Sequence, residues 1–97
     1  MTTKQRAKLR SMAAMFEPVL LIGKDGISDN TVRQCWDVLE ARELIKVSVL
    51  KNAPFTAREA CEEICEKTHA EPVQVIGNRF VIFRQGRKDS KIKLEDL

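Results

Sequence analysis

The sequence predicts a single α/β domain with the element order α-β-α-β-α-β-β, and three observations support this prediction. Residues 19–22 are a short apolar run and residues 43–50 have alternating β-branched residues, both typical of strands, and each is followed by a segment with helical periodicity. The pair Gly77-Asn78 separates two more apolar runs, which is typical of a hairpin turn. Strands that alternate with helices pair in parallel through right-handed crossovers, and the hairpin then adds one antiparallel strand.

The first helix is expected over residues 4–15, with Thr3 as its N-cap. Pro18 ends this helix, because the residue before a proline is pushed out of the helical region. The apolar residues 19–22 lie between Pro18 and Gly23, so we expect them to form a short strand that is buried on both faces.

The second helix is expected over residues 29–41, with Ser28 as its cap. Its apolar residues recur at i, i+3, i+4 and i+7, and they are Val32, Cys35, Trp36 and Leu39. Because Trp36 lies on this stripe, we expect it in the core rather than on a base-stacking surface. In the next strand, residues 43–50, β-branched side chains alternate along the chain and give the strand one strongly apolar face.

The third helix is expected over residues 57–69. Thr56 and Glu59 fit the capping box, in which each side chain bonds the other residue's backbone amide. One side of the helix is apolar, and the other side is acidic, with Glu59, Glu62, Glu63 and Glu66. The hairpin strands follow over residues 73–76 and 79–84.

Apolar residues become few after the hairpin. We therefore expect one folded domain over residues 1–84 and a basic, flexible tail over residues 85–97. The 97 residues are 43% hydrophobic and 32% charged, which fits one soluble globular domain.

The longest apolar run is residues 12–16, which is too short for a transmembrane helix or a signal-peptide core. We therefore expect a cytoplasmic, monomeric protein that starts near Met1 and has no membrane contact. Without an export signal, its three cysteines should be reduced thiols.

Basic residues gather at both ends of the chain. Residues 1–11 hold four basic residues and no acidic one, residues 84–97 hold five basic and three acidic residues, and the middle has a net charge of −3. The basic residues of the two ends are Lys4, Arg6, Lys8, Arg10, Arg84, Arg87, Lys88, Lys91 and Lys93. If these ends meet in space they form a patch suited to phosphates, whereas the plainer interpretation is that they keep a small protein soluble.

Patterns of catalytic residues are lacking. His69 is the single histidine, and the glycine-rich fingerprints of nucleotide-binding enzymes are absent, so we expect neither an enzyme nor a cofactor. Cys61, Cys65 and His69 are spaced by four and span about 12 Å of helix, too far for one zinc ion, although two of them with Cys35 could reach one. Because free cysteines usually pack as small hydrophobes, we expect no metal site.

The loop Gly23-Lys24-Asp25-Gly26 is the strongest local signal for binding. Two glycines three apart allow positive φ and a close approach of the backbone to a ligand. The loop precedes a helix N-terminus, which presents free amides and about half a positive charge. KH modules use such a G-x-x-G clamp on nucleotide backbones, although most G-x-x-G segments are plain turns.

Several segments follow the order and spacing of one family. They are Thr3-Lys4-Gln5-Arg6, Leu9-Arg10-Ser11, Glu17-Pro18-Val19, Ile22-Gly23-Lys24-Asp25-Gly26-Ile27-Ser28, Ala41-Arg42-Glu43-Leu44-Ile45-Lys46-Val47, Val73-Gln74-Val75-Ile76-Gly77 and Val81-Ile82-Phe83-Arg84. Over residues 3–84 the chain resembles the bacterial stand-alone CRM domains, the YhbY/YqeI-like RNA-binding proteins.

The resemblance implies a fold similar to the C-terminal domain of translation initiation factor three, with a four-stranded mixed sheet. It also implies binding to RNA and, from the bacterial members, to rRNA in precursors of the large ribosomal subunit. Gly23, Lys24, Asp25 and Gly26 correspond to the family's RNA-contacting loop, where Asp25 is a departure because the tip is more often neutral or basic. Two other departures are Ala14, where histidine is frequent, and Phe83, where tyrosine is usual.

Two functions therefore remain open. The first is a non-catalytic RNA-binding protein of ribosome assembly that uses the G-x-x-G loop and the basic ends. The alternative is a protein-interaction adaptor that docks through the acidic helix 57–69. For RNA binding, the basic ends and the loop should share one face, with the acidic helix on the opposite face.

Overall fold

The computed structural model describes residues 1–86 and 90–97. Its elements are α1 (Thr3–Ala13), β1 (Leu20–Ile22), α2 (Asp29–Arg42), β2 (Leu44–Val49), α3 (Ala57–Thr68), β3 (Glu71–Ile76), β4 (Arg79–Phe83) and the short 3-10 helix η1 (Leu94–Asp96). The predicted order α-β-α-β-α-β-β is confirmed. No helix in the described ranges is long and apolar enough to cross a membrane.

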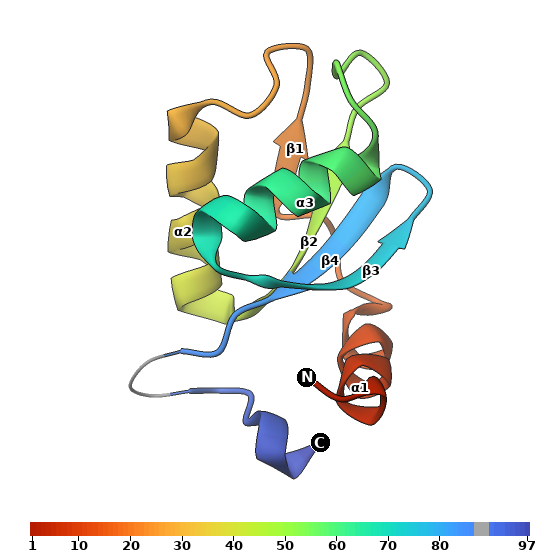
Figure 1. Ribbon diagram of the computed structural model, residues 1–97, viewed down its shortest axis with the longest axis vertical. Helices are drawn as coiled ribbons and strands as arrows, with labels where there is room; N and C mark the ends of the chain where they lie inside the picture. Colours follow the sequence, from red (N-terminus) through yellow and green to blue (C-terminus); the bar gives the residue numbers. More distant parts are fainter. Residues whose placement is uncertain (87–89) are drawn as a thin grey trace.

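The strands form one mixed sheet in the order β1-β2-β4-β3 (Figure 1). β1 pairs in parallel with β2, and β4 is antiparallel to both β2 and β3. β2 and β3 therefore run in the same direction, as a crossover through α3 requires, and β4 lies between them. The sheet is the four-stranded mixed sheet that the resemblance implies.

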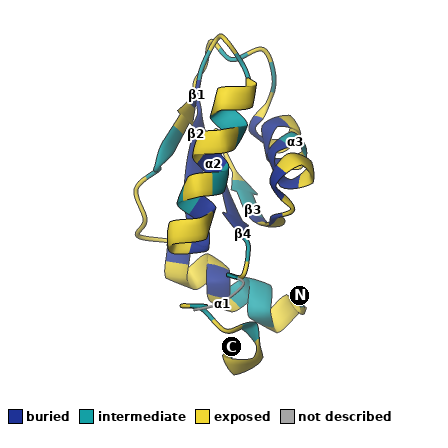
Figure 2. Cartoon of the chain, turned by 90° about the vertical axis from the view of Figure 1, so that its left-hand side faces the viewer, coloured by how far each residue is buried: buried dark blue, intermediate teal, exposed yellow. Residues whose placement is uncertain are grey.

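Helices cover the two faces of the sheet unequally. On one face, α2 and α3 enclose the larger core, which includes Leu39, Ile45, Ile64 and Phe80. On the other face, α1 covers a smaller core built around Leu9, Leu44, Val81 and Phe83. Figure 2 shows buried residues concentrated where the helices meet the sheet. Because α1 is a single short helix, its face of the sheet is only partly covered.

The N-cap of α1 is Thr2, not Thr3 as the sequence predicts. The Thr2 hydroxyl accepts a hydrogen bond from the Gln5 amide at 3.0 Å, and the Gln5 side chain accepts one from the Thr2 amide at 2.8 Å. This is a complete capping box, and glutamine at the third helical position decides between the two threonines. The caps predicted at Ser28 and Thr56 are confirmed.

β1 is not buried on both faces, which corrects the prediction for residues 19–22. It is an edge strand, and although Ile22 is buried, Leu21 is 61% exposed. A continuous apolar run is typical of a central parallel strand, but here the face that carries Leu21 has no helix over it in the described part of the chain. Trp36 also departs from prediction, because it is only partly buried and its ring lies against Arg84 and His69.

The C-terminal segment is docked, although the sequence predicts a flexible tail. Ile92, Leu94 and Leu97 pack against the smaller core beside α1. The buried carboxylate of Glu43 accepts hydrogen bonds from the backbone amides of Gly86, Lys91 and Ile92, the last two at 2.7 Å. Glu43 is the C-cap of α2 and has a positive φ of 67°.

Candidate nucleic-acid interface

The loop of residues 23–26 is a tight turn that leads into α2. The Gly26 amide donates to the Gly23 carbonyl at 3.0 Å, and Gly26 has a φ of +72°, a conformation that favours glycine. Gly23 has no such requirement, so only one of the two glycines is needed for its backbone angles. Lys24 and Asp25 are exposed at the tip of the turn. The loop therefore presents one cation and one carboxylate to solvent.

The four cations of α1 form two rows, because residues four apart share a helix face. Lys4 and Lys8 are exposed. The row of Arg6 and Arg10 lies toward β3, where the Arg6 guanidinium donates to the Pro72 carbonyl at 3.3 Å. One row thus faces solvent, and the other borders the sheet.

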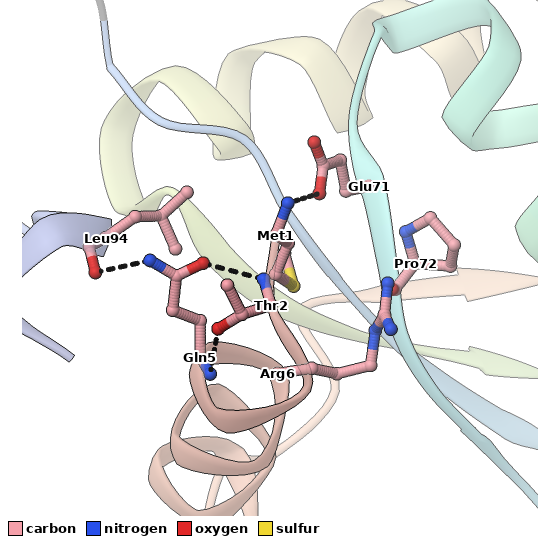
Figure 3. A network of polar contacts seen from close by, with 7 residues as sticks. All are labelled: Met1, Thr2, Gln5, Arg6, Glu71, Pro72 and Leu94. Atoms are coloured by element: carbon pink, nitrogen blue, oxygen red, sulfur yellow. Dashed lines mark hydrogen bonds and ion pairs between the residues drawn. The ribbon is translucent and has the colours of Figure 1, made fainter.

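The two ends of the chain meet, which the charge pattern left open. The Gln5 side-chain amide donates to the Leu94 carbonyl at 2.9 Å, and the terminal ammonium of Met1 lies 4.0 Å from the Glu71 carboxylate (Figure 3). However, α1 and both termini lie at one end of the molecule, whereas the β1–α2 loop lies at the other end of its longest axis (Figure 1). That axis measures 39 Å, so the loop and the basic ends do not form one compact cluster.

Arg84 is engaged within the protein, although the sequence places it among the RNA-binding residues. Its guanidinium lies 4.1 Å from the centre of the Trp36 ring and pairs with the Glu40 carboxylate at 2.8 Å. It also donates to the Thr68 carbonyl at 2.8 Å. Because 14% of the side chain is exposed, we assign Arg84 to holding α2, α3 and β4 together. Arg87 and Lys88 lie outside the described residues.

Two cations in the strands lie between the loop and α1, and neither was among the residues predicted to bind RNA. Lys46 in β2 is buried, and Arg79 in β4 is exposed. Both lie on the sheet face that α1 partly covers, because Lys46 pairs with Val81 and Arg79 pairs with Ser48 in the strand register. The sequence could have indicated Lys46, because a lysine and a serine interrupt that face of the strand predicted over residues 43–50.

The acidic helix lies on the opposite face of the sheet from α1, which is one part of the arrangement expected for RNA binding. Its glutamates are partly used in local contacts. The Glu59 carboxylate completes the capping box of α3, and Glu63 pairs with Lys67 at 2.9 Å. Glu62 and Glu66 are exposed.

The three cysteines are buried and free. Burial raises the pKa of the Cys35 thiol to about 11, with Arg84 opposing this effect. A hydrogen bond between the thiols of Cys61 and Cys65 lowers the pKa of Cys61. The same bond, together with burial, raises the pKa of Cys65. Within the described residues, no group of three histidine, cysteine or acidic side chains could hold a metal ion.

Known proteins are similar to this chain in sequence and in fold. The family model described as CRS1 / YhbY (CRM) domain matches residues 1–84. "Probable RNA-binding protein YqeI" of Bacillus subtilis is 38% identical over 94 residues, which cover 97% of this chain and 98% of that protein. An "RNA-binding protein" of Haemophilus influenzae is 31% identical over 94 residues, which cover 97% and 94%. The solution structure of SAV1595 from Staphylococcus aureus has a TM-score of 0.80 and 44% identity, covering 96% of this chain and 97% of that one.

Proposed function

The chain belongs to the CRS1/YhbY (CRM) domain family, and from this premise we propose that it is a non-catalytic protein that binds rRNA in precursors of the large ribosomal subunit. Two relatives that match this chain along nearly their whole length are named as RNA-binding proteins, one of them as probable, and this supports RNA as the partner. The step to ribosome assembly in the cytoplasm rests on the resemblance to the bacterial stand-alone CRM domains.

The observation that carries RNA binding is a set of exposed cations without acidic partners. Lys4, Lys8, Arg10 and Lys24 are exposed, and among the described residues none of them lies within 4 Å of a carboxylate. Such cations are free to contact phosphates and to release the counterions that RNA holds. The glutamates of α3 lie on the other face of the sheet, where they do not oppose an incoming RNA strand.

The salt dependence of RNA binding tests this proposal. With four to five phosphate contacts on single-stranded RNA, the logarithm of the affinity should fall with the logarithm of the salt concentration with a slope of about −3, at roughly −0.7 per contact. Replacing Lys4, Lys8 and Lys24 by alanine should flatten the slope by about 2. Fluorescence anisotropy with a labelled oligonucleotide at several salt concentrations measures both slopes.

The matched control is charge reversal on the opposite face. Glu62→Lys and Glu66→Lys change exposed residues of α3 and should leave the slope within about 0.5 of the wild-type value, since distant exposed charges are largely screened. If these two changes altered ribosome association and the lysine variants did not, the adaptor function would replace RNA binding.

Co-sedimentation tests the finer proposal. The tagged protein should migrate in sucrose gradients with precursors of the large subunit, and ribonuclease treatment should move it to the top of the gradient. A protein that stays with mature ribosomes alone, or with neither, would contradict the assembly role while leaving RNA binding intact.

A further inference from the structure

We propose that the half of the sheet face beyond α1 holds a segment of single-stranded RNA, with one phosphate between Lys46 and Arg10 and with bases on the exposed aliphatic side chains of the edge strands β1 and β3. This inference rests on the proposed RNA binding and names where and in what form the RNA lies. It also supplies the link between the loop of residues 23–26 and α1, which lie at opposite ends of the molecule.

The open half of the sheet is defined by one row of paired residues. Leu21, Ser48, Arg79 and Ile76 are successive partners across β1, β2, β4 and β3, so their side chains lie on one face. Leu21 and Ile76, at the two edges, are 61% and 60% exposed. This is the face that α1 covers lower down, where Leu44 and Phe83 are buried. The row therefore carries two exposed aliphatic side chains with an arginine between them.

A cleft of about 440 Å³ lies where this row meets α1. Arg10 and Ser11 line it from the helix, and Lys46, Gln74 and Ile76 line it from the sheet. Two cations, two neutral polar side chains and three aliphatic side chains, two of them alanines, line the cleft, and no carboxylate is among the described residues that line it. Its volume is within the range of clefts that bind small organic groups, and its charge suits an anion.

One wall of this cleft holds a buried cation, Lys46. It is 9% exposed, and no carboxylate lies within 4 Å of its ammonium in the described residues. Its Nζ donates to the Ala14 carbonyl at 3.4 Å, a long contact that uses one of three donors. The negative end of the α1 dipole favours the cation there, but a buried ammonium without an anion still loses much of its hydration. A phosphate in the cleft would supply the missing charge.

The surroundings favour RNA over an acidic protein segment. The loop of residues 23–26 follows β1 directly. Leu50, just after β2, lies beside this loop, because a Cβ added to Gly23 would be 3.6 Å from the Leu50 side chain. A strand of RNA can thus pass Lys24, Arg79 and Arg10 in turn, placing phosphates near cations along its length. Exposed aliphatic side chains between those cations can contact unpaired bases, whereas duplex RNA keeps its bases stacked inside.

The test uses three variants of the full chain and two probes, a 12-nucleotide single-stranded RNA and a duplex of the same sequence, both labelled for anisotropy. Lys46→Met removes the ammonium and keeps the aliphatic stem, and it should weaken single-strand binding about tenfold. Lys46→Arg should restore at least half of the lost affinity. Ile76→Glu places a carboxylate on an exposed wall of the cleft, and it should weaken single-strand binding at least tenfold and duplex binding less than threefold.

Controls separate this inference from the proposed function. Gln34→Glu adds the same charge at an exposed site on α2 and should change affinity less than twofold. If Lys24→Ala and Lys8→Ala weaken binding but Ile76→Glu and Lys46→Met do not, RNA binding stands and the open face is not its site. If the wild type binds neither probe, the proposed function itself fails.

Two further results decide the occupant, and a third guards against misfolding. Photo-crosslinking from a 4-thiouridine oligonucleotide should label peptides of β2, β3 or β4, and labels confined to α2 and α3 would overturn the inference. A poly-glutamate peptide that binds in a Lys46-dependent manner while RNA does not would assign the face to an acidic protein. Because Ile76 is exposed, its variant should keep the wild-type circular dichroism spectrum even if Lys46→Met unfolds.

Discussion

Replacing Glu43 by glutamine should release the C-terminal segment and destabilise the whole domain. The Glu43 carboxylate is 2% exposed and is the common acceptor for three backbone amides. Its Oε1 accepts from Lys91 and Ile92, each at 2.7 Å, and its Oε2 accepts from Gly86. A glutamine side chain has one acceptor oxygen, so in either orientation its amide group faces at least one N–H donor.

The expected cost follows from the hydrogen bonds lost. A hydrogen bond to a charged acceptor contributes about 1.5–3 kcal/mol, and a buried donor without a partner adds a penalty of similar size. Glu43→Gln loses one such bond and weakens the other two, so the free energy of unfolding should fall by about 2–4 kcal/mol. For a domain of this size, that corresponds to a fall in Tm of roughly 10–25 °C.

The pH dependence of stability gives a second signature. Burial alone would raise the pKa of Glu43, but hydrogen bonds from the amides of Gly86, Ile92 and Lys91 and from the Ser90 hydroxyl outweigh it and lower the pKa below 4.5. A carboxyl whose pKa is lowered on folding stabilises the protein above its unfolded pKa, and this stability is lost as pH falls through the folded pKa. The difference between wild type and Glu43→Gln should therefore be largest above pH 5 and shrink below pH 4.

Urea unfolding followed by circular dichroism from pH 3 to pH 7 measures this difference, and hydrogen exchange of the Ile92 amide reports on the segment directly. Gly86→Ala approaches the same contact from the other side, because its Cβ would lie 2.6 Å from the Glu43 carboxylate. The control Glu62→Gln, at an exposed site, should change stability by less than about 0.5 kcal/mol. A difference between wild type and Glu43→Gln that is under 1 kcal/mol, or constant with pH, would refute the reasoning.

Three further predictions concern the loop, the aromatic contact and the thiols. Gly26→Ala should lower the free energy of unfolding by about 1 kcal/mol because φ is positive at this position, whereas Gly23→Ala should lower it by less than about 0.5 kcal/mol. Thermal melts measure both losses, and equal losses would show that the positive φ of Gly26 is not the cause. Trp36→Ala should cost about 2 kcal/mol, less than a full core cavity, and Arg84→Ala in that background should add less than in the wild type, which a double-mutant cycle measures. Cys35 should react with a thiol reagent at pH 8 only in denaturant, because burial raises its pKa to about 11, and rapid labelling of the native protein would contradict this.

The fold was largely predictable, because local and periodic signals agree along the chain. The capping box at Thr56, the helical stripe that ends at Leu39 and the turn at Gly77 each depend on neighbours within a few residues. For the same reason, the boundaries of α2 and α3 agree with prediction to within a residue or so. The insertion of β4 between β2 and β3 is a choice among strand orders that local patterns do not determine.

The errors have a common physical cause, which is that burial depends on distant contacts. Leu21 and Trp36 belong to apolar patterns, yet one lies on an uncovered edge strand and the other beneath an arginine at the surface. The docked C-terminal segment depends on Glu43, more than forty residues before its amide partners. A carboxylate at a helix end resembles many solvated ones, so the sequence alone offers no sign of this role.

The exposure of most candidate cations could be predicted from their residue types, but their arrangement only in part. Lys4, Lys8 and Lys24 are exposed, as binding to phosphate requires, but Arg84 is held by Glu40 and Trp36. Arginine suits both tasks, because its planar guanidinium stacks on aromatic rings as readily as it binds phosphate. Charge counting along a sequence cannot distinguish the two.

The short length of α1 connects the stability of the protein to its proposed binding. Eleven helical residues span about 16 Å, and the helix ends at Ala13, so it can cover only part of one sheet face. Leu9 and Ala13 fill the smaller core, while Arg10, on the flank of the same helix, lines the cleft that opens beside Lys46. We therefore infer that α1, because it ends at Ala13, leaves part of this sheet face accessible to a ligand instead of burying the apolar side chains there.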